Sequence, residues 1–151
     1  MALSIRKAVA SDLSQLAQWN EKLIQDEGSR NPMNLEQLEE RMGEWLRGEW
    51  LIEIFEEEDH IVVGYAVYQI REDDFDPTDS YVYLRQLFID REYRSKGYGS
   101  ECVKLLISNV FSKGAKIEID VLQSNPRGRN FWTKVGFEPY FTKMKMNPVS
   151  E

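Results

Sequence analysis

A short basic stretch with two glycines, residues 94–100, holds the residue types of this 151-residue sequence that are best suited to chemistry. Apolar residues recur at helical spacing after Gly99, which predicts that a helix begins there. The first N–H groups of a helix have no partner within it, and the helix dipole adds partial positive charge at that end. Arg94 and Lys96 add formal positive charge. The stretch therefore predicts a binding site for a phosphate or diphosphate group.

The spacing of the glycines separates different kinds of phosphate site. No part of the stretch fits the P-loop pattern G-x-x-x-x-G-K-[ST]. In a dinucleotide-binding fingerprint the third glycine would fall at Cys102, and the glycines would follow the strand more closely. Asp120 does lie about 20 residues further on, where such a fold places an acid for the ribose. A nucleotide- or dinucleotide-binding module is therefore an alternative with an incomplete fingerprint.

Two motifs in the second half of the chain resemble those of the GNAT superfamily of N-acyltransferases. Arg94-Ser95-Lys96-Gly97-Tyr98-Gly99 resembles the family's Q/R-x-x-G-x-G/A signature. The segment from Asn125 is similar to N-x-x-A-x-x-F-Y-x-K-x-G-F, and the matching positions are Asn125, Gly128, Phe131, Trp132, Lys134, Gly136 and Phe137. The N-terminal half matches only in the order of its elements. The resemblance implies one α/β (α+β) GNAT-like domain over residues 1–151, with a mixed central sheet of about six to seven strands and about four helices.

The resemblance also implies a cofactor and a place for it. A splayed strand pair would form the cleft for acetyl-CoA, with its pantetheine arm bonded to strand backbone and its diphosphate on the basic stretch. The cofactor-binding residues implied in this way are Leu87, Phe88, Ile89, Arg94, Ser95, Lys96, Gly97, Tyr98, Gly99, Ser100, Asn125 and Phe131.

The implied reaction is transfer of an acetyl group to a primary amine of a small molecule or protein, by direct attack of neutral nitrogen. The family's usual proton donor is a tyrosine, but Trp132 stands at that position here. An indole N–H donates a hydrogen bond and not a proton. Either the thiol leaves unaided, with a pKa of ~8.5 if it resembles cysteine, or Tyr140, Tyr98 or water protonates it. A catalytically weak acyl-CoA-binding sensor is the alternative that this substitution favours.

The amine must lose a proton before it attacks, because an amine like lysine, with a pKa of ~10.4, is mostly protonated at neutral pH. Tyr83 stands where some relatives carry a glutamate, so the acids considered as the base are Glu27, Asp26 and Glu53. The acceptor site is expected at the first helix–loop–helix and on one face of the central strand. The implied substrate-side residues are Asp26, Arg30, Asn31, Tyr81 and Arg85.

Hydrophobic periodicity gives the elements that must position these residues. The patterns predict strands over residues 3–8, 50–55, 61–70, 81–89, 116–122 and 139–146. They predict helices from residue 13 to about Gly28, from a cap at Asn34 to about residue 46, over residues 99–112, and from Pro126 to Gly136.

Composition limits the function further. A net charge of −7 argues against a nucleic-acid-binding face and leaves room for a cationic substrate. The sequence has no apolar run long enough to span a membrane and no signal peptide. A single cysteine fits a reducing cytoplasm, and a single histidine, His60, has no neighbours of metal-ligand type. We therefore expect a cytoplasmic enzyme without a metal or a membrane or nucleic-acid partner, and a homodimer is compatible with the sequence.

Overall fold

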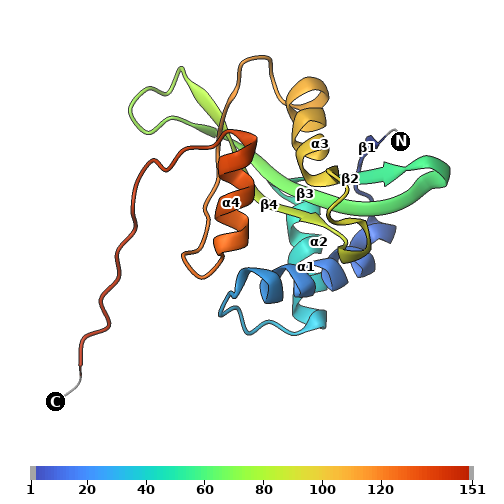
Figure 1. The fold of residues 1–151 in the computed structure, drawn as a ribbon, viewed down its shortest axis with the longest axis horizontal. Coiled ribbons are helices and arrows are strands. Elements are labelled where there is room, and N and C mark those ends of the chain that lie inside the picture. Colours follow the sequence, from blue (N-terminus) through green and yellow to red (C-terminus); the bar gives the residue numbers. More distant parts are fainter. Residues whose placement is uncertain (1–2, 150–151) are drawn as a thin grey trace.

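The computed structural model describes residues 3–149 (Figure 1). Their strands form a mixed sheet of five in the order β1-β2-β3-β4-β5. The first four strands pair antiparallel, and β4 and β5 pair parallel. The strands are β1 (Ser4–Lys7), β2 (Leu51–Glu57), β3 (Ile61–Glu72), β4 (Ser80–Ile89) and β5 (Lys116–Glu118). The mixed α+β architecture is confirmed, but the expected six to seven strands are not, since the described residues form five.

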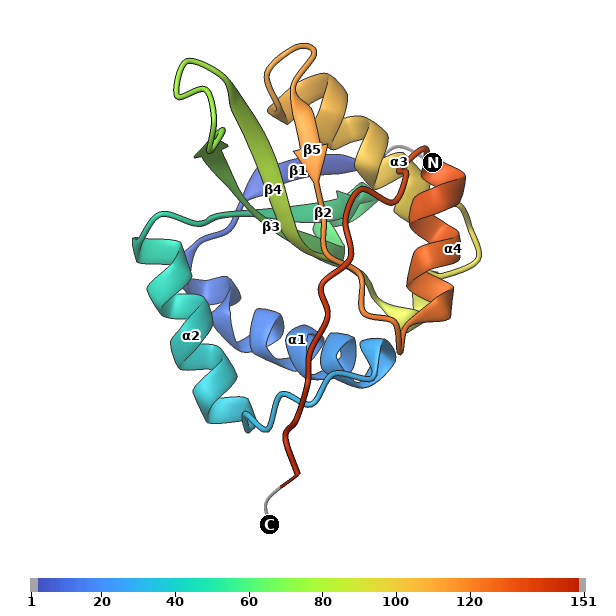
Figure 2. The same cartoon turned by 90° about the vertical axis from the view of Figure 1, so that its left-hand side faces the viewer.

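Four α-helices cover the two faces of this sheet. They are α1 (Leu13–Glu27), α2 (Leu35–Arg47), α3 (Tyr98–Leu105) and α4 (Pro126–Val135). Figure 2 shows α1 and α2 together on one face, with α3 on the other face and α4 beside it. None of these helices is both long and apolar enough to cross a membrane.

Local sequence signals set several helix boundaries. Asn34 caps α2 by accepting a hydrogen bond from the Gln37 N–H, and the Gln37 side chain accepts one from the Asn34 N–H in return. Asn125 caps α4, and Pro126 occupies its first turn, where a missing N–H costs no hydrogen bond. Gly28 ends α1 in the left-handed region, with a φ of 66°. These boundaries agree with the prediction because each depends on residues close together in sequence.

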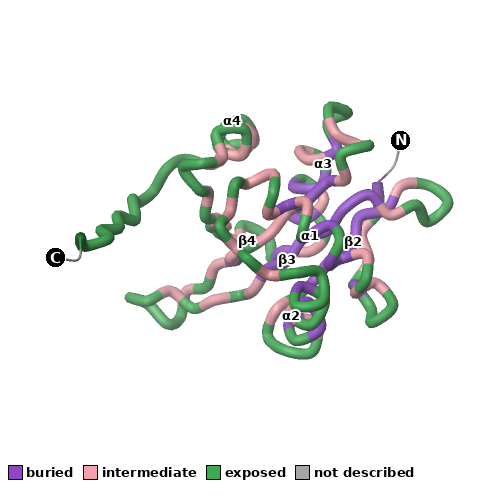
Figure 3. The backbone as a smooth tube through the Cα atoms, turned by 90° about the horizontal axis from the view of Figure 1, so that it is seen from below, coloured by how far each residue is buried: buried purple, intermediate pink, exposed green. Residues whose placement is uncertain are grey.

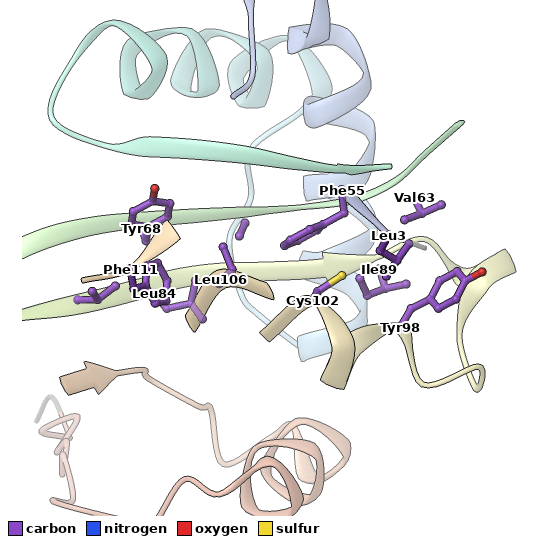
Figure 4. Close-up of a cluster of buried hydrophobic side chains, with 12 residues drawn as sticks. Leu3, Phe55, Val63, Tyr68, Leu84, Ile89, Tyr98, Cys102, Leu106 and Phe111 are labelled. Carbon is purple, nitrogen blue, oxygen red and sulfur yellow. The ribbon is translucent and has the colours of Figure 1, made fainter. Parts of the chain in front are cut away.

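The sheet separates two apolar cores. Between the sheet and α1–α2, the Trp19 and Tyr65 rings stack with their centroids 6.0 Å apart beside Phe88. Between the sheet and α3, Phe55, Cys102 and other buried side chains form the second core (Figure 4). The central strands β2 and β3 are buried along most of their length because both faces are covered.

The end of the chain differs from the prediction. Residues 138–149 form no strand, every one of them is exposed, and they run away from the sheet (Figures 1 and 3). Two other elements are shorter than expected: β5 ends at Glu118, and α3 ends at Leu105 and continues as a π-helical turn, Leu106–Val110. Alternation of apolar residues favours an extended backbone, but a strand also requires a partner strand, and the final segment has none among the described residues.

Candidate functional site

The two parallel strands part in the middle of the domain. The pairing of β4 with β5 runs from Tyr81–Lys116 to Tyr83–Glu118 and stops there, while β4 continues to Ile89 (Figure 2). β4 pairs with β3 along its whole length, while its other edge has no partner strand beyond Tyr83 among the described residues. The structure therefore has a splayed strand pair, and the predicted cofactor residues 87–89 lie on its open side.

The loop after β4 brings backbone amides and positive charge to the start of α3. Gly97 has a φ of 78°, in the left-handed region, and a Cβ there would meet no atom within 4 Å. The first hydrogen bond of the helix runs from the Glu101 N–H to the Gly97 carbonyl, at 3.1 Å. The N–H groups of Gly99 and Ser100 come before it and so have no partner within the helix. The Lys96 ammonium lies 5.7 Å from the centre of the Tyr93 ring and within 4 Å of no carboxylate in residues 3–149. This loop fits a diphosphate by its open surface, its amides and its charge.

Arg94 holds the loop in place. Its Nε donates to the Ile89 carbonyl at 2.9 Å and its Nη2 to the Asp26 carboxylate at 2.6 Å. Arg91 donates to the other oxygen of the same carboxylate at 2.9 Å. Arg94 and Asp26, expected to bind diphosphate and amine respectively, are therefore bound to each other. Neither charge is free for a ligand while this ion pair is intact.

Tyr98 points into the core and not into the cleft. Its ring is 3% exposed, stacks on Tyr93, and carries a hydroxyl that donates to Glu57 at 2.5 Å. Ser95, beside it in the loop, has a φ of 64°. Tyr98 thus anchors the first turn of α3 to the sheet, which fixes where the neighbouring amides point.

The second motif packs directly on the first. A Cβ added to Gly99 would lie 2.8 Å from Cε1 of Phe131, so α4 approaches the first turn of α3 as closely as a glycine allows. The Asn125 side chain accepts from the Gly128 N–H at 3.0 Å and so caps α4. The structure therefore brings the two motifs into contact through Gly99 and Phe131.

Glu27 is the last residue of α1. Its carbonyl accepts from the Ser124 hydroxyl at 3.1 Å, which joins the end of α1 to the turn before α4. Burial, and then the negative charge of Asp26, raise the pKa of Glu27 above the usual value for glutamate. A carboxylate with a raised pKa suits a proton acceptor.

Tyr83 and Asp120 form a second polar pair where the strands part. The Tyr83 hydroxyl donates to Asp120 at 2.5 Å, and burial followed by this hydrogen bond raises the pKa of Tyr83 to about 12. Asp120, which the sequence suggested only as a ribose-binding acid, is therefore the hydrogen-bond partner of Tyr83. Tyr81, two residues earlier on the same strand, is half-buried beside an open hollow of about 750 Å³.

Aromatic side chains that sequence reasoning assigned only to element packing extend this side of the site. Arg85 lies over two of them, with its guanidinium carbon 4.7 Å from the Trp45 ring centre and 5.1 Å from that of Trp50. Trp50 in turn lies 6.1 Å from Tyr83. An apolar stripe on a helix gives no signal that one of its members also packs against an arginine of the sheet.

The remaining predicted residues lie in different settings. Trp132 is half-buried and held edge-to-face by Phe131 and Phe137 at 4.9 and 5.1 Å. Tyr140 is 90% exposed on the extended C-terminal segment, so the structure does not bring it to the other residues. Asn31 accepts from the Met33 N–H in the α1–α2 loop, where Arg30 is exposed.

Three other reactive groups are accounted for by their surroundings. Glu53 is 2% exposed, pairs with Lys7 and accepts from the Tyr68 hydroxyl at 2.6 Å, so it serves a buried network at the sheet edge. Burial raises the pKa of Cys102 to about 12, which removes it as a nucleophile. In the described residues, no three histidine, cysteine, aspartate or glutamate side chains are arranged to hold a metal ion.

Comparison with known proteins adds a family and a fold. The model of the Acetyltransferase (GNAT) family matches residues 14–137. A "probable spermine N(1)-acetyltransferase" from Bacillus subtilis subsp. natto is 30% identical over 80 residues, covering 51% of this chain and 53% of that protein. This chain therefore matches about half the length of that relative.

Solved structures share the fold over nearly the whole chain. A mutant BH1408 protein from Bacillus halodurans superposes with a TM-score of 0.77 at 23% identity, over 97% of this chain and 99% of that one. A predicted acetyltransferase from Clostridium acetobutylicum, solved with acetyl-CoA, gives a TM-score of 0.72 at 18% identity, over 97% and 96% of the two chains.

Proposed function

The chain belongs to the GNAT acetyltransferase family, and from this premise we propose that it transfers an acetyl group from acetyl-CoA to a primary amine of a small molecule. The observation that carries the proposal is the parting of β4 from β5 after Tyr83–Glu118, beside an amide-rich loop at the start of α3. A thioester laid along the open edge of β4 would have its diphosphate at that loop. We expect the protein to act in the cytoplasm.

The loop residues hold the cofactor in this proposal. Lys96 and the amides of Gly99 and Ser100 bind the diphosphate, and Arg94 positions them through its bonds to Asp26 and Ile89. The β4 backbone at residues 87–89 binds the pantetheine arm, with Asn125 and Phe131 on its other side. When bound, acetyl-CoA supplies the activated acetyl group.

The acceptor-side residues then handle protons and orientation. Glu27 accepts a proton from the incoming ammonium, since its raised pKa makes it a stronger base than an ordinary glutamate. Tyr83, with a pKa of about 12, stays protonated at neutral pH and donates to Asp120, so it orients and does not act as an acid. A β4 backbone N–H at residue 87 or 88 stabilises negative charge on the acyl oxygen. Trp132 can stabilise the departing sulfur only by a hydrogen bond. Tyr140 lies on the exposed C-terminal segment and Tyr98 points into the core, so solvent supplies the proton.

A small-molecule acceptor is favoured over a protein. The supporting observation is the name of the matched relative, a probable spermine acetyltransferase, over the half of its length that aligns.

The cofactor site is tested by calorimetry with coenzyme A. We expect the protein to bind it, Lys96→Ala to weaken the affinity about tenfold, and Lys113→Ala, which removes an exposed lysine away from the loop, to change it little. Absence of heat with the unaltered protein, or equal effects of the two substitutions, would contradict the assignment. Stronger binding of NAD or ATP than of coenzyme A would favour the nucleotide-binding alternative.

The alternative function is a catalytically weak acyl-CoA sensor, which Trp132 at the usual tyrosine position favours. Steady release of coenzyme A with a panel of amines separates the two. Turnover that falls in Glu27→Gln supports the enzyme, and coenzyme A binding without turnover supports the sensor.

A further inference from the structure

Two arginines on the acceptor side share one aromatic ring and lack a counter-charge. The guanidinium carbon of Arg41, from α2, lies 4.4 Å from the centre of the Trp45 ring, and that of Arg85, from β4, lies 4.7 Å from it. In residues 3–149, neither guanidinium has a carboxylate within 4 Å. Stacking on an aromatic ring stabilises a cation but does not neutralise it.

Arg41 is also incompletely hydrogen-bonded. One of its terminal nitrogens donates to the Asn20 side-chain oxygen at 3.0 Å, but its buried Nε has no partner, and neither has the buried Nδ2 of Asn20. Burial, followed by the charge of Arg85, lowers the pKa of Arg41. The half-buried Arg41 is therefore held near a second, exposed cation, Arg85, in a chain whose net charge is −7. Burial of Arg41 without a counter-charge is costly, and an anion bound beside it would offset that cost.

Other arginines in the structure show the contrast. Arg6, Arg91 and Arg94 each have a carboxylate oxygen within 3.1 Å. Arg71 lies over the Tyr83 ring at 4.1 Å and borders a hollow whose other lining residues include Glu49, Glu72 and Asp74. In residues 3–149, the exposed arginines Arg30, Arg47, Arg127 and Arg129 also lack a carboxylate within 4 Å. Arg41 differs from them because it is half-buried and stacks on a ring that a second arginine shares.

The pair lies next to the proposed reaction centre. Arg85 lies two residues beyond Tyr83, the last residue of β4 that pairs with β5. The positive charge of Arg85 acts to lower the pKa of the Tyr83 hydroxyl. The next residue, Gln86, accepts a hydrogen bond from Tyr65 at 2.8 Å in the core beneath α1 and α2. An acceptor whose amine faces Glu27 and the open edge of β4 would extend its other end over this arginine pair.

We infer that the acceptor amine carries an anionic group, a carboxylate or a phosphate, which Arg41 and Arg85 bind against the Trp45 ring. This inference rests on the proposed acetyl transfer and names its substrate class. Guanidinium groups match the planar oxygens of carboxylate and phosphate and bind them bidentately. A polyamine would instead bring a second cation to this place, so the inference separates this chain from the activity that the spermine relative's name suggests.

The experiment compares amines that differ only in the anion. The matched pairs are 4-aminobutyrate with 4-aminobutanamide and ethanolamine phosphate with ethanolamine, with spermidine as the polycation. We expect the unaltered protein to acetylate the anionic member of one pair with a kcat/KM at least about tenfold higher, and the pair preferred distinguishes carboxylate from phosphate. Arg85→Gln should remove this preference, because it lowers kcat/KM for the anionic amine about tenfold more than for its neutral partner.

Two further variants control for fold and charge. Arg47→Gln removes an exposed arginine from the same helix as Arg41 and should leave the preference unchanged. Arg41→Lys keeps the charge in a half-buried position but loses the planar guanidinium group, and should weaken the preference for the anionic amine several-fold. Folding of each variant is checked by its melting temperature.

The outcomes separate this inference from the proposed function. Acetylation of neutral amines or spermidine as fast as of the anionic amines, unaffected by Arg85→Gln, overturns the anion site and leaves acetyl transfer standing. If no amine is acetylated, calorimetry with ethanolamine phosphate and 4-aminobutyrate, with and without coenzyme A, decides. Binding of either that Arg85→Gln weakens about tenfold supports the anion site, and no binding of either overturns it.

Discussion

Arg94 and Asp26 form an ion pair, Nη2 to Oδ2 at 2.6 Å, that joins the loop before α3 to the last turn of α1. The two side chains are 28% and 24% exposed, so water screens the pair only in part. Arg94 also donates to the Ile89 carbonyl at the end of β4. Through these bonds the cofactor loop and the acceptor-side helix hold each other in position.

A double-mutant cycle should detect this link. We expect Asp26→Asn and Arg94→Gln each to lower the free energy of unfolding, and the pair to show a coupling of about 1 kcal/mol in urea denaturation. Coenzyme A affinity should fall in both single variants because the loop loses its anchor. Asp74→Asn, an exposed aspartate on the β3–β4 loop, should change neither quantity. Additive effects on stability would show that the ion pair contributes nothing.

A second prediction concerns the contact between the two sequence motifs. Gly99→Ala places a methyl group 2.8 Å from Cε1 of Phe131, closer than two carbon atoms can lie. We expect this substitution to lower the free energy of unfolding by about 1–3 kcal/mol and to weaken coenzyme A binding as α4 moves away. Adding Phe131→Leu, which shortens the opposing side chain, should recover part of both losses. Ser100→Ala, the next position of α3, serves as the control for helix propensity, and equal effects of the two alanine variants would contradict the packing argument.

The fold was predictable where one short stretch of sequence decides the structure. The reciprocal hydrogen bonds of Asn34 and Gln37 fixed the start of α2, and Asn125 with Pro126 fixed the start of α4. The strand count was wrong because the alternation in residues 139–146 says nothing about a partner strand. β5 likewise ends at Glu118 although its apolar alternation continues.

The site was predictable in its parts but not in its pairings. Sequence reasoning selected Arg94 and Asp26 as ligand-binding residues, yet it could not show that they bind each other across 68 positions of sequence. The same holds for Tyr83 and Asp120, which lie 37 positions apart. Trp45 and Arg41 were not selected, because a residue on the apolar stripe of a helix and a basic residue beside it have the pattern of any amphipathic helix.

The raised pKa of Glu27 gives a prediction about pH and stability. Its pKa in the folded protein lies above the ordinary value of 4.5, so the folded state binds this proton more tightly than the unfolded state does. The ionised Glu27 carboxylate therefore lowers the free energy of unfolding. This loss is absent below about pH 4.5, grows as pH rises toward the folded-state pKa, and is complete above it. Glu27→Gln should raise the melting temperature at pH 8 and leave it unchanged near pH 4, while it lowers the acetylation rate.

The control for this prediction is Glu21→Gln, which alters an exposed glutamate of the same helix. We expect that variant to show no such dependence of melting temperature on pH. A lower melting temperature of Glu27→Gln at pH 8 would mean that the ionised carboxylate stabilises the fold, and Glu27 would then be a structural residue.

The last prediction concerns the C-terminal segment, whose apolar side chains lie outside both cores. Tyr140, Phe141, Met144 and Met146 are 90%, 70%, 88% and 84% exposed. Since burial of apolar surface is what stabilises a fold, replacing all four by serine should shift the melting temperature by less than about 2 °C. Trp132→Ser, which removes a half-buried ring held by Phe131 and Phe137, should lower it by several degrees. A large loss in the four-serine variant would instead mean that this segment packs on a sheet in solution, and its dependence on protein concentration would show whether that sheet belongs to the same chain or to a second copy.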